Sequence, residues 1–95
     1  MERGWVFDES KNVAVFTTKQ IIFEGEPILY VVHDEEDGAW QFLHDSIVSL
    51  DDAAVAGLSE IVEMDESINE LYNLPLGWEA FRIKKAAQWE WQKTL

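Results

Sequence analysis

The chain has 95 residues, a formal net charge of −12 and no cysteine, and 47% of its residues are hydrophobic, including five Trp. A chain of this length predicts one domain, and its apolar content is sufficient for a modest core. The lack of cysteine excludes disulfides, thiol catalysis and cysteine-ligated zinc. Because we find no membrane-spanning run and no signal-peptide pattern, we expect a cytoplasmic protein without membrane contacts.

The charge is distributed unevenly along the chain. No Lys or Arg lies between Lys19 and Arg82, whereas fifteen Asp and Glu residues lie in that span. Such a surface repels nucleic acid, whose binding requires neutralisation of phosphates. The same surface would attract a basic protein by electrostatic steering. Solubility alone is an equally good explanation for a charge excess of this kind.

The N-terminal third of the chain predicts one strand and its surroundings. Residues 5–7, Trp-Val-Phe, alternate and predict either a short edge strand or a cover for the core. Residues 13–18 are rich in β-branched side chains and predict a strand. Residues 19–23 continue it as a strand or as one helical turn, and Gly25 and Pro27 end this element.

The clearest local signal is a β-hairpin over residues 28–43. Two apolar arms flank an acidic tip that ends in Asp37 and Gly38, and Asp-Gly readily adopts the positive φ angles of a tight turn. We expect this hairpin to form the centre of the sheet, with its first arm covered on both faces. Trp40 and Phe42 alternate on the second arm and are therefore predicted to anchor the core.

The middle of the chain predicts a helix followed by an ambiguous segment. Ser49, followed closely by two aspartates, is typical of a helix N-terminus. Residues 53–56 would continue this helix, and Gly57 would stop it in a left-handed cap. Residues 58–64 fit either a strand or a longer helix. Because Gly57 interrupts the helical pattern, we predict a strand there.

A second helix is predicted after Asp65, which would cap it. Ile68, Leu71 and Tyr72 then share one helical face. Residues 74–77 contain Pro and Gly and end this helix.

The C-terminal part predicts a last strand over residues 78–83 and a tail over residues 84–95. The tail would be either a helix packed by one Trp or a loosely docked arm. Together, these elements predict a single α+β domain over residues 1–95. Its small antiparallel sheet would be organised on the central hairpin, with one or two short helices.

Paired carboxylates are abundant but indicate no catalytic site. The pairs Asp51-Asp52 and Asp65-Glu66 lie where helix caps would place them, so we interpret them as caps. Acid–base catalysis requires two carboxyl groups in different environments within a cleft. We find no phosphate-binding loop, no nucleophile motif and no serine triad pattern. We therefore predict a protein that is not an enzyme and has no cofactor.

The two histidines were tested as metal ligands. His33 and His44 flank the hairpin, and we expect them to lie near each other across its strands. They lack the local spacing of a metal site, and we predict none. A calcium loop aligned on Gly38 would place His33 at its first position and His44 at its twelfth, so the tip does not match that loop.

Several motifs follow one another along the chain: Tyr30-Val31-Val32, an acidic turn, Gly38-x-Trp40-x-Phe42, Asp65-Glu66-Ser67-Ile68 and Leu74-Pro75-x-Gly77-x-x-x-Phe81-Arg82. Their order resembles a family of small bacterial domains of unknown function that is also predicted to serve as immunity proteins in polymorphic-toxin systems. The similarity covers roughly residues 13–83, which is most of the chain. It implies an α+β fold, no catalysis and neutralisation of a toxin by direct binding, with the acidic turn as a variable segment.

We therefore predict a non-enzymatic interaction domain whose acidic face occludes a basic partner, such as a toxin nuclease. The predicted contact residues are the acidic residues of the hairpin tip and of the helix start, namely Asp34, Glu35, Glu36, Asp37, Asp51 and Asp52. One alternative is a small-ligand or regulatory module with an aromatic pocket around Trp40 and Trp78. Another is a hydrolase built on paired carboxylates. The sequence makes no prediction of the oligomeric state.

Overall fold

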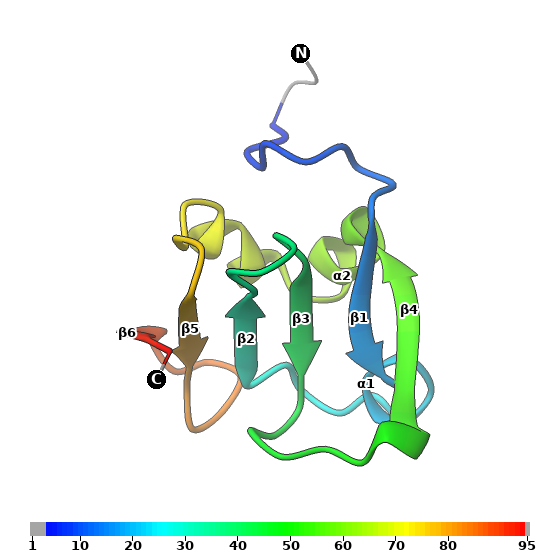
Figure 1. Cartoon of the computed structure of the whole chain (residues 1–95). Helices are drawn as coiled ribbons and strands as arrows, with labels where there is room; N and C mark the ends of the chain where they lie inside the picture. Colours follow the sequence, from blue (N-terminus) through cyan, green and yellow to red (C-terminus); the bar gives the residue numbers. More distant parts are fainter. Residues whose placement is uncertain (1–3, 95) are drawn as a thin grey trace.

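Six strands form one open, mixed sheet in the order β4-β1-β3-β2-β5-β6 (Figure 1). The computed structural model describes residues 4–94. All neighbouring strands are antiparallel except β1 and β3, which are parallel. The predicted α+β class is confirmed, although the sheet is mixed rather than purely antiparallel. The strands are β1 Ala14–Thr18, β2 Tyr30–His33, β3 Trp40–Leu43, β4 Ala53–Gly57, β5 Trp78–Phe81 and β6 Glu90–Lys93.

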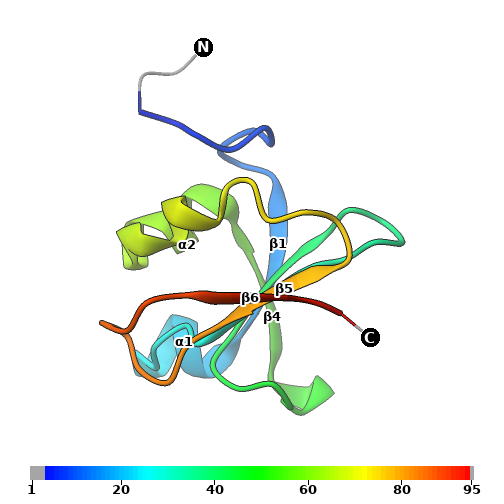
Figure 2. The same cartoon turned by 90° about the vertical axis from the view of Figure 1, so that its left-hand side faces the viewer.

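The α-helices are short and lie on one face of the sheet. Figure 2 looks along the sheet from its β6 edge and shows α1 and α2 on the same side of it. The opposite side, which we call the open face, carries no α-helix among residues 4–94, although the short 3₁₀ helix η1 lies on that side. The helical elements are the α-helices α1 Lys19–Glu24 and α2 Leu58–Met64 and the 3₁₀ helices η1 Leu50–Asp52 and η2 Glu66–Leu71.

The predicted hairpin is confirmed and lies at the centre of the sheet. β2 and β3 pair in antiparallel register from Tyr30 opposite Leu43 to His33 opposite Trp40. Gly38 has a φ of +72°, a conformation that side-chain-bearing residues rarely adopt. Within β2 only Val31 is fully buried, because the open face leaves alternate side chains accessible. The expectation that this arm is covered on both faces is therefore wrong.

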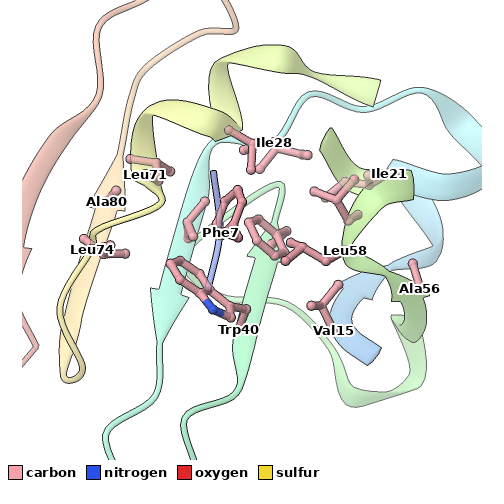
Figure 3. Close-up of a cluster of buried hydrophobic side chains, with 14 of the residues drawn as sticks. Phe7, Val15, Ile21, Ile28, Trp40, Ala56, Leu58, Leu71, Leu74 and Ala80 are labelled. Atoms are coloured by element: carbon pink, nitrogen blue, oxygen red, sulfur yellow. The ribbon is translucent and has the colours of Figure 1, made fainter. Parts of the chain in front are cut away.

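The core fills the space between the sheet and its helical layer (Figure 3). Trp40 and Phe42 are buried there, as predicted. Phe7 packs its ring edge-on against Trp40, with ring centroids 5.5 Å apart. Residues 5–7 thus cover the core instead of forming an edge strand. The buried aliphatic residues around these rings include Val15, Ile21, Ile28, Val31, Leu58, Ile61, Ile68, Leu71 and Leu74.

The structure reverses the two predictions made for residues 53–64. Ser49 caps only the short η1, and the following residues form β4, which pairs along its whole length with β1. Residues 58–64 form α2, with Leu58 and Ile61 buried at helical spacing. Gly57 begins this helix rather than ending one, and its N–H donates to Glu60 Oε1 at 3.0 Å. The first prediction failed because continuous pairing with β1 overrides the weak local preference of the alanine-rich segment. The second failed because it depended on the first: Gly57 ends a strand here and does not interrupt a helix.

Asp65 caps the next element as predicted, since its carboxylate accepts the N–H of Ser67 at 3.0 Å. That element is the 3₁₀ helix η2 rather than an α-helix. A 3₁₀ helix has three residues per turn, so residues three apart share a face. Ile68 and Leu71 are accordingly buried together, whereas Tyr72 points outward and is 50% exposed.

The tail is neither a helix nor a loose arm. Residues 90–93 form β6, an edge strand antiparallel to β5, with Trp91 opposite Ala80. The predicted strand at residues 78–83 is confirmed as β5, but it is not the last strand. Trp89 is buried just before β6 begins.

Arg82 directly follows β5 and is buried against three other parts of the chain. Its Nε and Nη2 donate to the carbonyl of Ile28, at 3.1 and 2.9 Å. Its Nη1 donates to Ser67 Oγ at 2.9 Å, and Nη2 forms an ion pair with Asp65. The guanidinium stacks over the ring of Trp89 at 4.0 Å. Arg82 therefore ties β5 to the start of β2, to η2 and to the segment before β6.

We predict that Asp65→Ala lowers the free energy of unfolding by about 3–5 kcal/mol, because it leaves the buried Arg82 cation without its partner. Urea unfolding followed by Trp fluorescence measures this change. Glu66→Ala is the matched control, since it removes an exposed neighbouring carboxylate and should change stability by no more than about 0.5 kcal/mol. Equal effects of the two substitutions would contradict the structural role of the pair.

The ion pair also predicts an acid-sensitive stability. Burial by itself raises the pKa of Asp65, but hydrogen bonds from Ser67 and Arg82 and the charge of Arg82 outweigh it and hold the pKa below its usual value. The stability that Asp65 contributes is therefore present above a pH of about 3.9 and is lost as the pH falls through the lower folded pKa. Acid unfolding curves of Asp65→Asn should show a smaller loss of stability in this range than those of the native chain.

Candidate functional site

The acidic residues predicted to contact a partner lie at opposite ends of the sheet. Residues 34–37 form the turn that follows β2, whereas Asp51 and Asp52 lie in η1, which precedes β4. β4 runs in the same direction as β2, because each is antiparallel to one of the two parallel strands β1 and β3. The turn and η1 therefore lie beyond different ends of the sheet (Figure 1). The structure does not bring these two groups together.

Two of the four tip carboxylates hold the turn itself. Asp34 Oδ1 accepts the N–H of Glu36, and Asp37 Oδ1 accepts the N–H of Ala39, both at 2.9 Å. The carboxylates of Glu35 and Glu36 are exposed and make no hydrogen bond or ion pair within residues 4–94. These two side chains are thus available to a partner. A hollow of about 400 Å³ beside them is lined by Val32, His33, Asp34, Glu35, Glu36, Gly77 and Thr94.

The two histidines do not lie near each other, so that expectation is wrong. His33 pairs with Trp40 at the tip end of the hairpin, whereas His44 follows the last residue of β3 at the other end. The ring of His33 stacks on Trp40 at 4.0 Å, and its Nδ1 lies 2.7 Å from the carbonyl oxygen of Leu74. Its Nε2 lies 3.9 Å from Glu9 Oε2. No group of three potential ligands that could hold a metal is found in the described part of the chain.

The aromatic residues proposed for a pocket belong to the core or to its border. Trp40 is 2% exposed, and its Nε1 donates to Glu9 Oε2 at 2.9 Å. Phe42 is fully buried, and Trp78 is half-buried and packs against the core. None of these three rings lines any of the three main surface hollows of residues 4–94.

A second hollow, of about 440 Å³, lies on the open face between the centre of the sheet and the loop after β3. Strand alternation places Tyr30, Glu79 and Gln92 on this face, since Glu79 pairs with Gln92 and Tyr30 with Phe81. His44 Nδ1 lies 3.0 Å from Thr18 Oγ1 at the edge of this region. The hollow is lined by Leu29, Tyr30, His44, Asp45, Ser46, Glu79, Phe81, Arg82 and Gln92.

Glu79 is the buried carboxylate of this hollow, with 8% of its surface exposed. Tyr30 donates its hydroxyl hydrogen to Glu79 Oε1 at 2.7 Å, and Gln92 Nε2 donates to Oε2 at 2.6 Å. Thr94 Oγ1 adds a longer contact to Oε1 at 3.4 Å. Burial raises the pKa of Tyr30, and the hydrogen bond and negative charge of Glu79 raise it further, to about 12. At neutral pH Tyr30 is therefore a hydrogen-bond donor.

The sequence did not identify this site. Glu79 is visible in the sequence as a polar residue in an alternating strand, which usually indicates a solvated position. Its burial depends on pairing with β6, which the sequence did not predict. Strand alternation would have indicated that Glu79 faces away from the core, but it could not have identified Tyr30 and Gln92 as its neighbours.

The negative charge of the chain is largely unneutralised at the surface. Of the fifteen acidic residues between Lys19 and Arg82, Asp65 and Glu79 are buried and the other thirteen are exposed or half-exposed. None of these thirteen forms an ion pair with a described Lys or Arg. Among residues 4–94, no helix has the length and apolar character needed to cross a membrane.

Comparison of the chain with protein-family models, curated proteins and solved structures gave no match in any of the three. Its own side chains and their geometry are therefore the basis for a functional proposal. They offer two features: an acidic surface without counter-charges, and a hollow on the open face that contains a buried carboxylate.

The Tyr30–Glu79 hydrogen bond predicts an unusual tyrosine titration. In a Tyr72→Phe background, Tyr30 is the remaining tyrosine, and we expect it to ionise near pH 12. Adding Glu79→Gln should lower this pKa, because the nearby negative charge is removed, but it should stay above the usual value because Tyr30 remains buried. Ultraviolet absorbance of the phenolate measures both. Because the folded pKa is raised, the stability contributed by Tyr30 is complete below pH about 10 and is lost as the pH rises through about 12. Equal midpoints in the two variants would argue against the bond.

Proposed function

We propose that this protein acts by binding a basic protein partner through its acidic surface, rather than by catalysis. The observation that carries this proposal is the set of thirteen accessible carboxylates without a Lys or Arg partner among the described residues. Repulsion among like charges destabilises a compact fold. A basic partner would relieve this repulsion and would be steered to the surface during association.

The open face of the sheet supports binding because it combines apolar and acidic side chains. Phe16 and Val55 pair across β1 and β4 on this face, and they are 49% and 63% exposed. Leu50 in η1 is 92% exposed and is followed by Asp51 and Asp52. Protein interfaces commonly have an apolar centre with a polar rim. The open face provides such a surface next to carboxylates.

The family resemblance of the sequence favours a toxin as the basic partner. An immunity protein neutralises its toxin by occluding the toxin surface, and this requires a fast-forming and tight complex. Electrostatic steering provides rapid association, with rate constants well above those of uncharged pairs. We therefore propose toxin neutralisation as the specific form of this binding function.

The two separated acidic groups allow a sharp test, once a partner has been captured from the native host at low salt. The variants Glu35→Lys/Glu36→Lys and Asp51→Lys/Asp52→Lys carry the same change in net charge at opposite ends of the sheet. Asp34 and Asp37 are left unchanged because they hold the turn. Both variants should slow association, by on the order of tenfold at low salt.

Only the variant that alters the interface itself should also speed dissociation, because one partner contacts one part of the surface. Stopped-flow or biosensor kinetics at several salt concentrations separate these effects. Circular dichroism and thermal unfolding show whether each variant is folded. Association rates that do not change with salt, or capture of partners that are not basic, would contradict the proposal.

A further inference from the structure

We propose that the hollow on the open face is a receptor for a guanidinium group, and that an arginine side chain of the basic partner occupies it. The part of this inference that concerns a partner rests on the proposed function. The guanidinium site itself rests on the residues of the hollow.

The first argument is the uncompensated charge of Glu79. The chain buries two carboxylates, Asp65 and Glu79, within its described residues. Asp65 has the cation of Arg82 beside it, whereas Glu79 is hydrogen-bonded only to the neutral side chains of Tyr30, Gln92 and Thr94. A buried carboxylate without a cation is costly, because hydrogen bonds from neutral groups replace only part of its hydration. A cation that enters the hollow would complete this site.

The second argument is the remaining hydrogen-bonding capacity of the carboxylates that line the hollow. Each carboxylate oxygen has two lone-pair positions. Glu79 Oε2 accepts one hydrogen bond, from Gln92, so a lone-pair position remains. Asp45 lies at the exposed rim, and the bonds that it accepts, from Ser46, both go to its Oδ1. Both carboxylates that line the hollow therefore have unused acceptor positions for the N–H donors of a ligand.

The third argument is the aromatic lining. Tyr30 and Phe81 face each other across β2 and β5, and both line the hollow. A guanidinium group is planar, is only weakly hydrated and stacks on aromatic rings, whereas a lysine ammonium is compact and strongly hydrated. The combination of aromatic rings and carboxylates thus favours arginine over lysine. A volume of about 440 Å³ is large enough for an arginine side chain.

Arg82 also lines the hollow, but its cation does not neutralise Glu79. Alternation along the chain after Phe81 directs the side chain of Arg82 to the core side of the sheet. There its guanidinium is occupied by Asp65, Ser67 and the carbonyl of Ile28. The hollow therefore retains the negative charge of Glu79.

The test uses the full chain and the probe Nα-acetyl-arginine amide, followed by ¹H–¹⁵N NMR titration. We expect weak, saturable binding with a Kd on the order of 1 mM, as is typical of a single small fragment. Shifts should concentrate on the backbone amides of Tyr30, Glu79 and Gln92 and on the Gln92 side-chain amide. The lysine analogue should bind several-fold more weakly. The citrulline analogue, which has a similar shape without the charge, should not bind measurably.

Variants identify the groups responsible. Glu79→Gln should weaken binding of the arginine probe by about tenfold or more, because it removes the charge while keeping the size of the side chain. Glu63→Gln is the matched control, since it removes the same charge from an exposed carboxylate on α2, on the other side of the sheet, and should leave the affinity unchanged. Phe81→Leu removes a stacking surface without touching the carboxylate. It should weaken binding of arginine more than binding of lysine. This variant keeps the test decisive even if Glu79→Gln does not fold.

Two results would overturn the guanidinium site. One is binding of the citrulline analogue as tight as that of arginine. The other is a set of small shifts spread over all acidic segments and reduced equally by Glu63→Gln and Glu79→Gln, which indicates ion condensation without a site. If the probe binds the hollow but no basic partner is captured, the site stands and the proposed function fails. If a basic partner binds Glu79→Gln as tightly as the native chain, the function stands and the arginine assignment fails.

Discussion

The buried guanidinium of Arg82 is the contact on which the arrangement of this fold depends. It directly follows β5, donates to the carbonyl before β2, pairs with Asp65 at the cap of η2 and stacks on the ring of Trp89. One side chain thus joins the centre of the sheet, the helical layer and the segment leading to β6. A buried ion pair adds little net stability compared with apolar packing, but its hydrogen bonds tolerate few other arrangements. Its role here is therefore to select one arrangement of these segments.

The features that local sequence could predict are those whose causes are local. The hairpin was predictable because a turn-forming Asp-Gly lies between two β-prone arms, and Trp40 and Phe42 were identifiable as core residues from their alternation. The cap at Asp65 was also predictable, because a carboxylate before a helical segment accepts nearby N–H groups. The resulting outline of an α+β domain was correct. Each of these features requires only residues close together in the chain.

The features that were missed depend on pairing between distant segments. β4 has an alanine-rich sequence that suits a helix, yet it becomes a strand because β1 provides a complete partner for it. β6 is a strand for the same reason, since its residues are exposed and gain their order from β5. Glu79 and Tyr30 are far apart in sequence but become neighbours when β2 and β5 pair. No local pattern contains this information, because it resides in the order of strands across the sheet.

The fold explains the charge of one buried carboxylate, Asp65, but not the charge of the other, Glu79. Asp65 and Arg82 neutralise each other, and the hydrogen bonds of the guanidinium hold the segment before β2 and η2 in place. Glu79 also connects strands, through Tyr30 and Gln92, but neutral or apolar side chains could do so without burying a charge. A structural role therefore accounts for the position of Glu79 and leaves its charge unexplained. The charge is explained if a cation from outside the chain completes the site, and the hollow beside Glu79 provides the place for it.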